Sequence, residues 1–134
     1  MVTGAQLPRS DMHALPRGCV MPLQHKVVED IAEMFRVLSH PTRIRILTLL
    51  HQGEHDVTEL RDLLGVSAAN VSQHLTILRA RHFVRMRREG TRVYYSLGDA
   101  RLADLINCAL DLLDEDLSLT GEIRQAIQQV RLRS

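Results

Sequence analysis

Five polar residues occur in and just before one predicted helix, residues 68 to about 81. They carry short hydroxyl groups, amides and an imidazole: Ser67, Asn70, Ser72, Gln73 and His74. Such side chains can hydrogen-bond to base edges in a DNA major groove, where amides favour adenine. No acidic residue lies in this helix, which suits a polyanionic partner. Ser67 fits simple N-capping as well, and His74 fits packing at the edge of the core.

A second polar group is basic and surrounds a predicted turn at Glu89-Gly90. It consists of Arg87, Arg88, Thr91 and Arg92. Residues 63–97 hold six arginines and one acid, whereas residues 99–122 hold seven acids and one arginine. Contacts from such arginines to phosphates give affinity and orientation but little sequence choice. A solvated strand edge protected by charge is the alternative interpretation.

Two helices are predicted ahead of these groups. The first runs from about Leu23 to Leu38, on the helical spacing of Val27, Val28, Ile31, Met34, Phe35 and Leu38. Ser39-His40-Pro41 ends it, because proline disfavours helical geometry in the preceding residue. The second runs from Pro41 to Gln52 and ends at Gly53; its apolar face contains Ile44, Ile46, Leu47, Leu49 and Leu50.

The next two helices are short and close together. Asp56 can cap a helix over residues 57–64, with Glu59 placed as in a capping box. After the turn at Gly65-Val66, Ser67 can cap the helix over residues 68–81, whose apolar side is Val71, Leu75 and Leu78. Two helices joined by a short glycine-containing turn have the layout of a helix-turn-helix. Residues 83–88 and 91–97 then read as a β-hairpin.

A last long helix is predicted from Asp99 to Asp116. Its apolar residues cover more of the circumference than one core contact requires, which predicts a partner chain: Leu102, Leu105, Ile106, Ala109, Leu110, Leu112, Leu113 and Leu117. The sequence therefore predicts a mainly α fold with a small β-hairpin wing. We expect a flexible arm over residues 1–23, a winged helix-turn-helix domain over 24–118, and a C-terminal tail over 119–134 with room for a short helix.

Composition sets the protein class. The chain has 134 residues, 45% of them hydrophobic and only four aromatic, with a net charge of +1. This length favours one domain with a core rich in Leu, Ile, Val and Ala. We find no long apolar run, no signal-peptide pattern and only two cysteines, so we expect a cytoplasmic protein with no membrane partner. No catalytic motif is present either, so we do not expect an enzyme.

Three segments together resemble the ArsR/SmtB family of winged-helix repressors. They are residues 35–47 (FRVLSHPTRIRIL), 66–79 (VSAANVSQHLTILR) and 84–97 (VRMRREGTRVYYSL). The resemblance spans about residues 34–113. It implies a homodimer formed by the first and last helices, a double-stranded DNA operator as partner, and an effector that weakens DNA binding. We therefore predict a transcriptional repressor whose small effector is unknown. A winged-helix protein-interaction module is the alternative from another class.

The family's metal sites are not intact in this sequence. Its Cys-x-Cys pair falls on Asp56 and Thr58, and its last-helix zinc ligands fall on Asp99, Arg101, Leu112 and Glu115. An arginine and a leucine cannot bind zinc, which prefers Cys and His ligands. The cysteine that a thiol-sensing branch carries in its second helix also has no match, since Thr48 lies near that position.

The remaining sensor candidates are Cys19 and Cys108. Because the family packs the first helix against the partner's last helix, the resemblance lets these cysteines meet, within or between chains. Such a pair permits a disulfide or polysulfide switch, or a nonstandard soft-metal site helped by His13 or His25, and hence a metal-responsive repressor. The alternative interpretation, which the sequence favours for Cys108, is a small buried hydrophobe at the dimer contact. We expect His51 and His55 to be solvated loop histidines.

Overall fold

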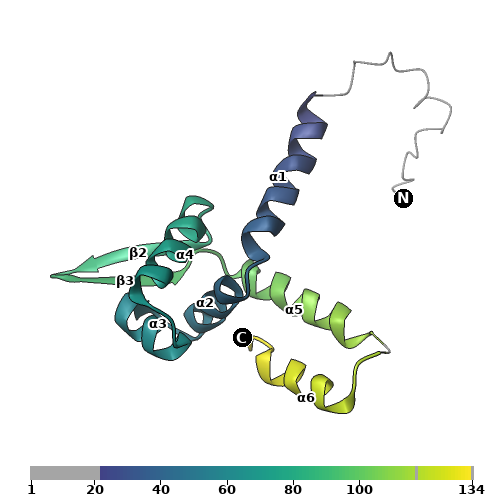
Figure 1. The fold of residues 1–134 in the computed structure, drawn as a ribbon. Helices are drawn as coiled ribbons and strands as arrows, with labels where there is room; N and C mark the ends of the chain where they lie inside the picture. The colour runs from purple at the N-terminus through teal and green to yellow at the C-terminus, as the bar shows by residue number, and fades with distance from the viewer. Residues whose placement is uncertain (1–21, 117, 134) are drawn as a thin grey trace. The chain divides into compact units, whose positions relative to one another are not determined.

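The computed structural model describes residues 22–116 and 118–133 (Figure 1). The chain divides into two units, residues 1–35 and 36–134. The predicted arm lies almost wholly outside the described residues. Within residues 22–116 and 118–133, no helix is both long enough and apolar enough to cross a membrane.

Helix α1 spans Pro22–Leu38, close to the predicted range. An exposed apolar stripe follows its length, at the spacing of three and four residues that places side chains on one helix face: Leu23, Val27, Val28, Ile31 and Phe35. Elsewhere on the helix, Lys26 pairs with Asp30 at 3.1 Å and His25 with Glu29 at 3.1 Å. Such pairs four residues apart support a helix.

Helix α2 spans Pro41–Gln52, as predicted. The Nδ1 atom of His40 caps it by accepting the Thr42 backbone N–H at 3.2 Å, and Pro41 occupies the first turn, where a missing N–H is harmless. Ile46, Leu47 and Leu50 are buried along one side. This side of α2 faces the core, and α2 contacts α3, α4, α5 and β3 of the second unit.

Helices α3 (Val57–Leu64) and α4 (Ala68–Ala80) form the predicted pair. The Asp56 carboxylate accepts the Glu59 N–H at 2.8 Å, and the Ser67 hydroxyl accepts the Asn70 N–H at 3.1 Å. The capping box is incomplete, because the Glu59 carboxylate pairs with His55. Gly65 ends α3 with φ of 68°, in the left-handed region that glycine enters without strain.

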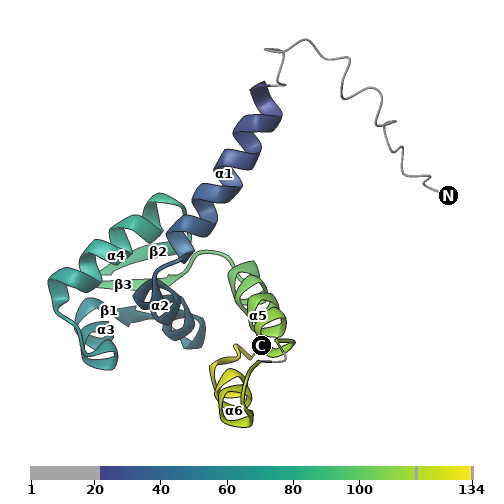
Figure 2. The same cartoon turned by 45° about the vertical axis from the view of Figure 1, so that its right-hand side comes forward.

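The sheet contains three antiparallel strands in the order β1-β3-β2: β1 (His55–Asp56), β2 (Val84–Glu89) and β3 (Arg92–Leu97). Glu89 pairs with Arg92, so the two-residue turn is Gly90-Thr91 and not Glu89-Gly90. Strand β1 was not predicted, because two residues are too few for a periodic pattern. Figure 2 shows the sheet with α4 running alongside β2 and β3.

The core of the second unit lies where α2, α3, α4 and the sheet meet. Its fully buried side chains come from each of these elements: Ile46, Leu47, Leu60, Val71, Leu75, Leu78 and Val84. Burial of this much branched aliphatic surface is the main force that fixes the helix-turn-helix.

Helix α5 spans Arg101–Asp114 and is shorter than predicted at both ends. Asp99 does not begin the helix; its carboxylate accepts the Arg101 backbone N–H at 2.9 Å from outside it. Leu102, Ala103 and Ile106 are buried. Leu117, the last apolar residue of the predicted pattern, lies outside the described residues.

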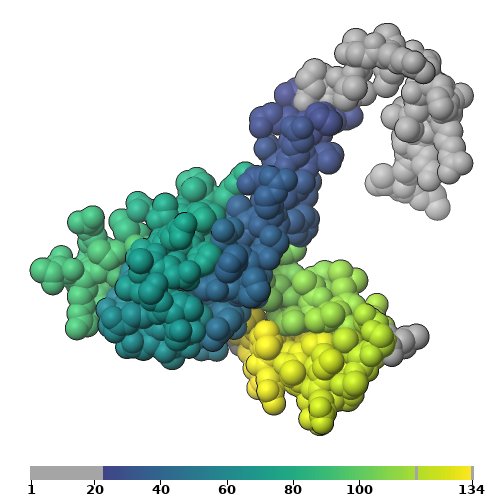
Figure 3. All heavy atoms as spheres, viewed as in Figure 1, coloured from purple at the N-terminus to yellow at the C-terminus, as the bar shows by residue number. Residues whose placement is uncertain are grey.

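Helix α6 spans Gly121–Val130 and fits the short helix allowed for the tail. It lies against α5 (Figure 3). Ile127 of α6 and Leu132, which follows the helix, are buried. The Asn107 amide makes two hydrogen bonds to the Leu132 backbone, at 2.7 and 2.9 Å, and Arg131 pairs with Asp111 at 2.6 Å. These contacts tie the C-terminal segment to α5.

Candidate nucleic-acid interface

The outer face of α4 is exposed and polar. Ser72 and Gln73 are both exposed, as predicted, while Val71, Leu75 and Leu78 on the other side are at most 1% exposed. Thr76 and Arg79 continue the exposed face by steps of three and four residues. Neither was predicted, although the same spacing extends the pattern from Ser72 and Gln73 to them.

The two residues at the start of this segment are less available than expected. The Ser67 hydroxyl is exposed but already accepts the cap hydrogen bond from Asn70. Asn70 is half-buried, and its Oδ1 is enclosed without a hydrogen-bond partner. A two-point contact to adenine needs both polar atoms of an amide. Asn70 therefore cannot make that contact in this conformation.

His74 does not belong to the exposed face, and the expectation that it contacts bases is corrected here. It is only 6% exposed. Its Nδ1 accepts a hydrogen bond from Arg43 Nε at 3.2 Å, and its ring lies 4.4 Å from that of His40. Arg43 also donates to the Val37 carbonyl at 3.0 Å. His74 thus links α4 to the start of α2 and the end of α1.

The environment of His74 favours its neutral form. Burial removes water from the ring, and the neighbouring His40 and Arg43 add positive charge, so the pKa of His74 lies below its ordinary value. The hydrogen bond from Arg43 needs an unprotonated Nδ1. A proton at this atom would remove the acceptor and place two cations side by side.

The strand register separates the hairpin arginines onto two faces. Arg88 pairs with Val93 across the ladder and shares a face with the Met86–Tyr95 pair. Arg87 pairs with Tyr94 on the opposite face, and Arg92 lies on that face too. Met86 receives a hydrogen bond from Arg79 of α4. The Arg88 face is therefore the one directed toward α4.

Arg87 is engaged by carboxylates. Its guanidinium contacts Glu54 at 2.7 Å and Glu89 at 2.8 Å and lies 4.9 Å from the centre of the Tyr94 ring. The two carboxylates raise the pKa of Arg87. A phosphate contact from Arg87 would have to compete with these two carboxylates. Arg88, Thr91 and Arg92 are exposed.

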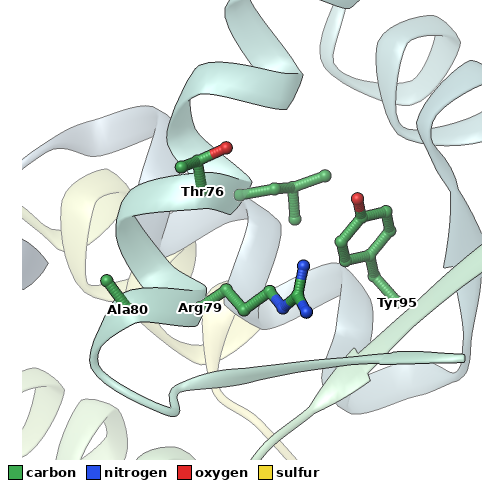
Figure 4. A pocket seen from close by; sticks show the side chains of 5 residues that line it. Thr76, Arg79, Ala80 and Tyr95 are labelled. Atoms are coloured by element: carbon green, nitrogen blue, oxygen red, sulfur yellow. The ribbon is translucent and has the colours of Figure 1, made fainter.

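A cleft separates α4 from the hairpin (Figure 4). It has a volume of about 280 Å³ and is lined by Leu75, Thr76, Arg79, Ala80 and Tyr95. Arg79 reaches across it, with Nη1 3.4 Å from the Met86 sulfur. The exposed face of α4 and the Arg88 face of the hairpin are the two sides of this cleft.

The described residues contain no arrangement of three or more His, Cys, Asp or Glu side chains that could hold a metal. Asp99 is paired with Arg101 at 2.7 Å; this side chain and the Arg101 backbone lower the pKa of Asp99 to about 2. Cys108 is exposed in the single chain, not buried. Cys19 and His13 lie outside the described residues. The predicted pairing of Cys19 with Cys108, and the metal-binding help expected from His13, are therefore not described.

The expectation that His51 and His55 are solvated loop histidines is wrong. His51 lies in the last turn of α2, with Nε2 2.6 Å from the Arg133 carbonyl oxygen. His55 lies in β1, with Nδ1 2.9 Å from the Glu59 carboxylate. Both are half-buried. Sequence spacing gave no sign of the first contact, because Arg133 is far away along the chain. The second joins residues only four apart, so its spacing was visible, but β1, which carries His55, was not predicted.

Known proteins resemble this chain over the same elements. Residues 40–85 match the family model "Bacterial regulatory protein, arsR family". A probable mercury resistance operon repressor of Streptomyces lividans is 40% identical over 81 residues, which cover 60% of this chain and 65% of that protein's length. The crystal structure of Rv0081 from Mycobacterium tuberculosis is 38% identical with a TM-score of 0.64, covering 69% of this chain and 93% of that one.

A third likeness is to the solution structure of Mb0332 from Mycobacterium bovis, described as a homodimeric winged helix-turn-helix DNA-binding domain. It is 30% identical with a TM-score of 0.64, and covers 71% of this chain and 88% of that one. The fold is therefore a winged helix-turn-helix, as predicted. The chain belongs to the ArsR family of bacterial regulatory proteins.

The neutral His74 makes stability depend on pH. Its pKa is lowered in the folded chain, so the unfolded chain takes up the proton first as the pH falls below about 6.5. Stability is therefore full above that pH and declines below it. We expect urea unfolding at about pH 7.5 and about pH 5.5 to show a smaller decline for His74→Asn than for the wild type.

His25→Asn is the matched control, because His25 is an exposed histidine on α1. It should keep the decline of the wild type. Equal declines for the wild type and His74→Asn would contradict the neutral, buried role of His74.

Proposed function

We propose that this chain is a sequence-specific DNA-binding transcriptional regulator that represses as a homodimer. One observation carries the proposal: Ser72 and Gln73 are exposed on α4, and Arg88 lies on the hairpin face directed toward that helix. The relatives' names as repressors support the sign of regulation. In this proposal α4 enters the major groove and the hairpin contacts the adjacent backbone.

In this proposal the polar residues of α4 give sequence specificity, and the hairpin arginines give affinity. Gln73 can form two hydrogen bonds to the edge of one base, with Ser72 beside it. Arg88 contacts a phosphate of any sequence from the hairpin face directed toward α4, and Arg92, next to the hairpin turn, does so from the opposite face. The absence of acidic residues on α4 spares the helix repulsion from the backbone.

Gln73→Ala should weaken binding to the preferred operator selectively. We expect a loss of about 1–3 kcal/mol on an operator selected from a pool of random duplexes, and little loss on mixed-sequence DNA. Fluorescence anisotropy on both duplexes measures the difference. Gln52→Ala, which removes an exposed amide at the end of α2, is the control and should leave both affinities unchanged. A loss that is equal on both duplexes would remove base reading from Gln73.

The two neighbouring arginines of β2 form a natural matched pair. Arg88→Ala should lower affinity on every duplex and reduce the log–log salt dependence by about one unit. Arg87→Ala should change that slope much less, because Glu54 and Glu89 already neutralise this guanidinium. Titrations at several salt concentrations test both variants. Equal slopes for the wild type and Arg88→Ala would exclude the hairpin face from the interface.

The dimer is proposed to use the faces of α1 and α5 that remain apolar and exposed. On α1 these are the stripe residues from Leu23 to Phe35, and on α5 Leu112 is 69% and Leu113 46% exposed. Exposed apolar surface of this extent marks interaction sites. The homodimeric state of the Mb0332 domain supports a second copy as the occupant.

The effector is proposed to act through the Cys108 thiol on the same face of α5. Cys108 lies four residues from Leu112 and is exposed. A polar or bulky adduct there would enter the dimer contact. A metal that favours thiolates could act at the same atom, and the name of the Streptomyces lividans relative favours this ligand class.

Sedimentation velocity tests the dimer and the thiol together. We expect Leu112→Glu to shift the wild-type dimer to monomer, because two buried carboxylates cannot be solvated at the contact. Gln125→Glu on the exposed surface of α6 adds the same charge and should remain dimeric. Methyl methanethiosulfonate should dissociate the wild type but not Cys108→Ser. A Leu112→Glu dimer would contradict the proposed face, and dissociation of modified Cys108→Ser would exclude Cys108 as the sensor.

A further inference from the structure

We infer that the cleft between α4 and the hairpin binds one phosphate group of the DNA backbone, with Arg79 and Tyr95 as its donors. This inference rests on the proposed DNA binding and adds a site to it. Neither residue was assigned a role from the sequence. The cleft has a volume of about 280 Å³, and Figure 4 shows the Arg79 guanidinium and the Tyr95 ring beside the same space.

Arg79 has most of its hydrogen-bonding capacity unused. In the described part of the chain the one hydrogen bond of its side chain is to the Met86 sulfur, at 3.4 Å, and a thioether is a weak acceptor. A guanidinium carries five N–H donors in a planar fork that matches two oxygens of a phosphate. This contrasts with Arg87, whose fork is already filled by two carboxylates.

The contact with Met86 also sets the position of the Arg79 side chain. Met86 pairs with Tyr95 across β2 and β3, so the guanidinium lies close to the strand pair that carries the tyrosine. Tyr95 is half-buried, and its hydroxyl can donate one more hydrogen bond. Thr76 supplies no donor, because its hydroxyl donates to the Ser72 carbonyl at 2.9 Å.

The charge of the cleft suits an anion. None of the five described residues that line it is acidic, and Arg79 gives it a positive charge. Its position suits a backbone phosphate in particular. On α4, Gln73 lies two helical turns before Ala80, which lines the cleft. On β2, Arg88 lies two residues after Met86, which pairs with the cleft residue Tyr95. A strand of DNA whose bases meet Gln73 and whose backbone reaches Arg88 would pass over this cleft.

Anisotropy titration tests the site with a fluorescein-labelled duplex of mixed sequence, about three helical turns long. Arg79→Gln should weaken binding about tenfold and reduce the log–log salt slope by about one. Arg79→Lys should keep the slope and lose only part of the affinity, because it keeps the charge without the fork. Tyr95→Phe should weaken binding a few-fold with the slope unchanged.

Arg101→Gln is the matched control. It removes one exposed arginine charge at the start of α5, where the guanidinium is paired with Asp99. We expect its slope to equal that of the wild type. Equal slopes for Arg79→Gln and Arg101→Gln, in a chain that binds the duplex, would overturn the phosphate site and leave the proposed function standing. A wild-type chain that binds no duplex would overturn both.

A free phosphate is the other source of the same chemistry. Replacing chloride with inorganic phosphate at constant ionic strength should affect the wild type and Arg79→Gln alike if the site takes the DNA backbone. A saturable loss of DNA binding at millimolar phosphate that Arg79→Gln abolishes would assign the cleft to a free anion and overturn the backbone assignment.

Discussion

Burial of one side of α4 is the constraint on which the candidate interface depends. Val71, Leu75 and Leu78 are at most 1% exposed, and truncating one such leucine typically costs about 2–5 kcal/mol. Since residues on a helix repeat every three to four positions, fixing these three leaves Ser72, Gln73, Thr76 and Arg79 no place but the surface. The core thus sets the direction of the polar residues, and the loops at either end have little freedom to change it.

The hydrogen bond between Arg43 and His74 adds a polar constraint to this apolar one. Aliphatic packing tolerates small rotations of a helix, whereas a 3.2 Å hydrogen bond in a part-buried position is directional. It connects the middle of α4 to α2, and through the Val37 carbonyl to the end of α1. The apolar packing sets how deeply α4 lies in the core, and the hydrogen bond also fixes the rotation of α4 about its axis.

Much of this arrangement could be predicted from the sequence because local rules govern it. The caps Asp56 and Ser67, the proline at the start of α2 and the spacing of apolar residues fixed the helix ranges within a few residues. Two features of the interface that the sequence did not indicate depend on contacts between distant segments. The position of His74 depends on Arg43, and the neutralisation of Arg87 depends on Glu54. The separation of Arg87 from Arg88 required only the alternation of a strand, and the sequence contained that signal.

Helix α5 shows how one element can serve three contacts. Leu102, Ala103 and Ile106 are buried; Asn107, Asp111 and Asp114 meet α6 and the segment after it. The residues left between these two sides include Leu105, Cys108, Ala109 and Leu112, of which the last three are exposed, together with the exposed charged residues Arg101 and Asp104. The C-terminal segment therefore narrows the free surface of α5 to one strip. A second chain that docks on the Leu112 side of α5 would meet the thiol of Cys108, which lies one helical turn before Leu112. That geometry would couple chemistry at one sulfur atom to assembly without moving α4 itself.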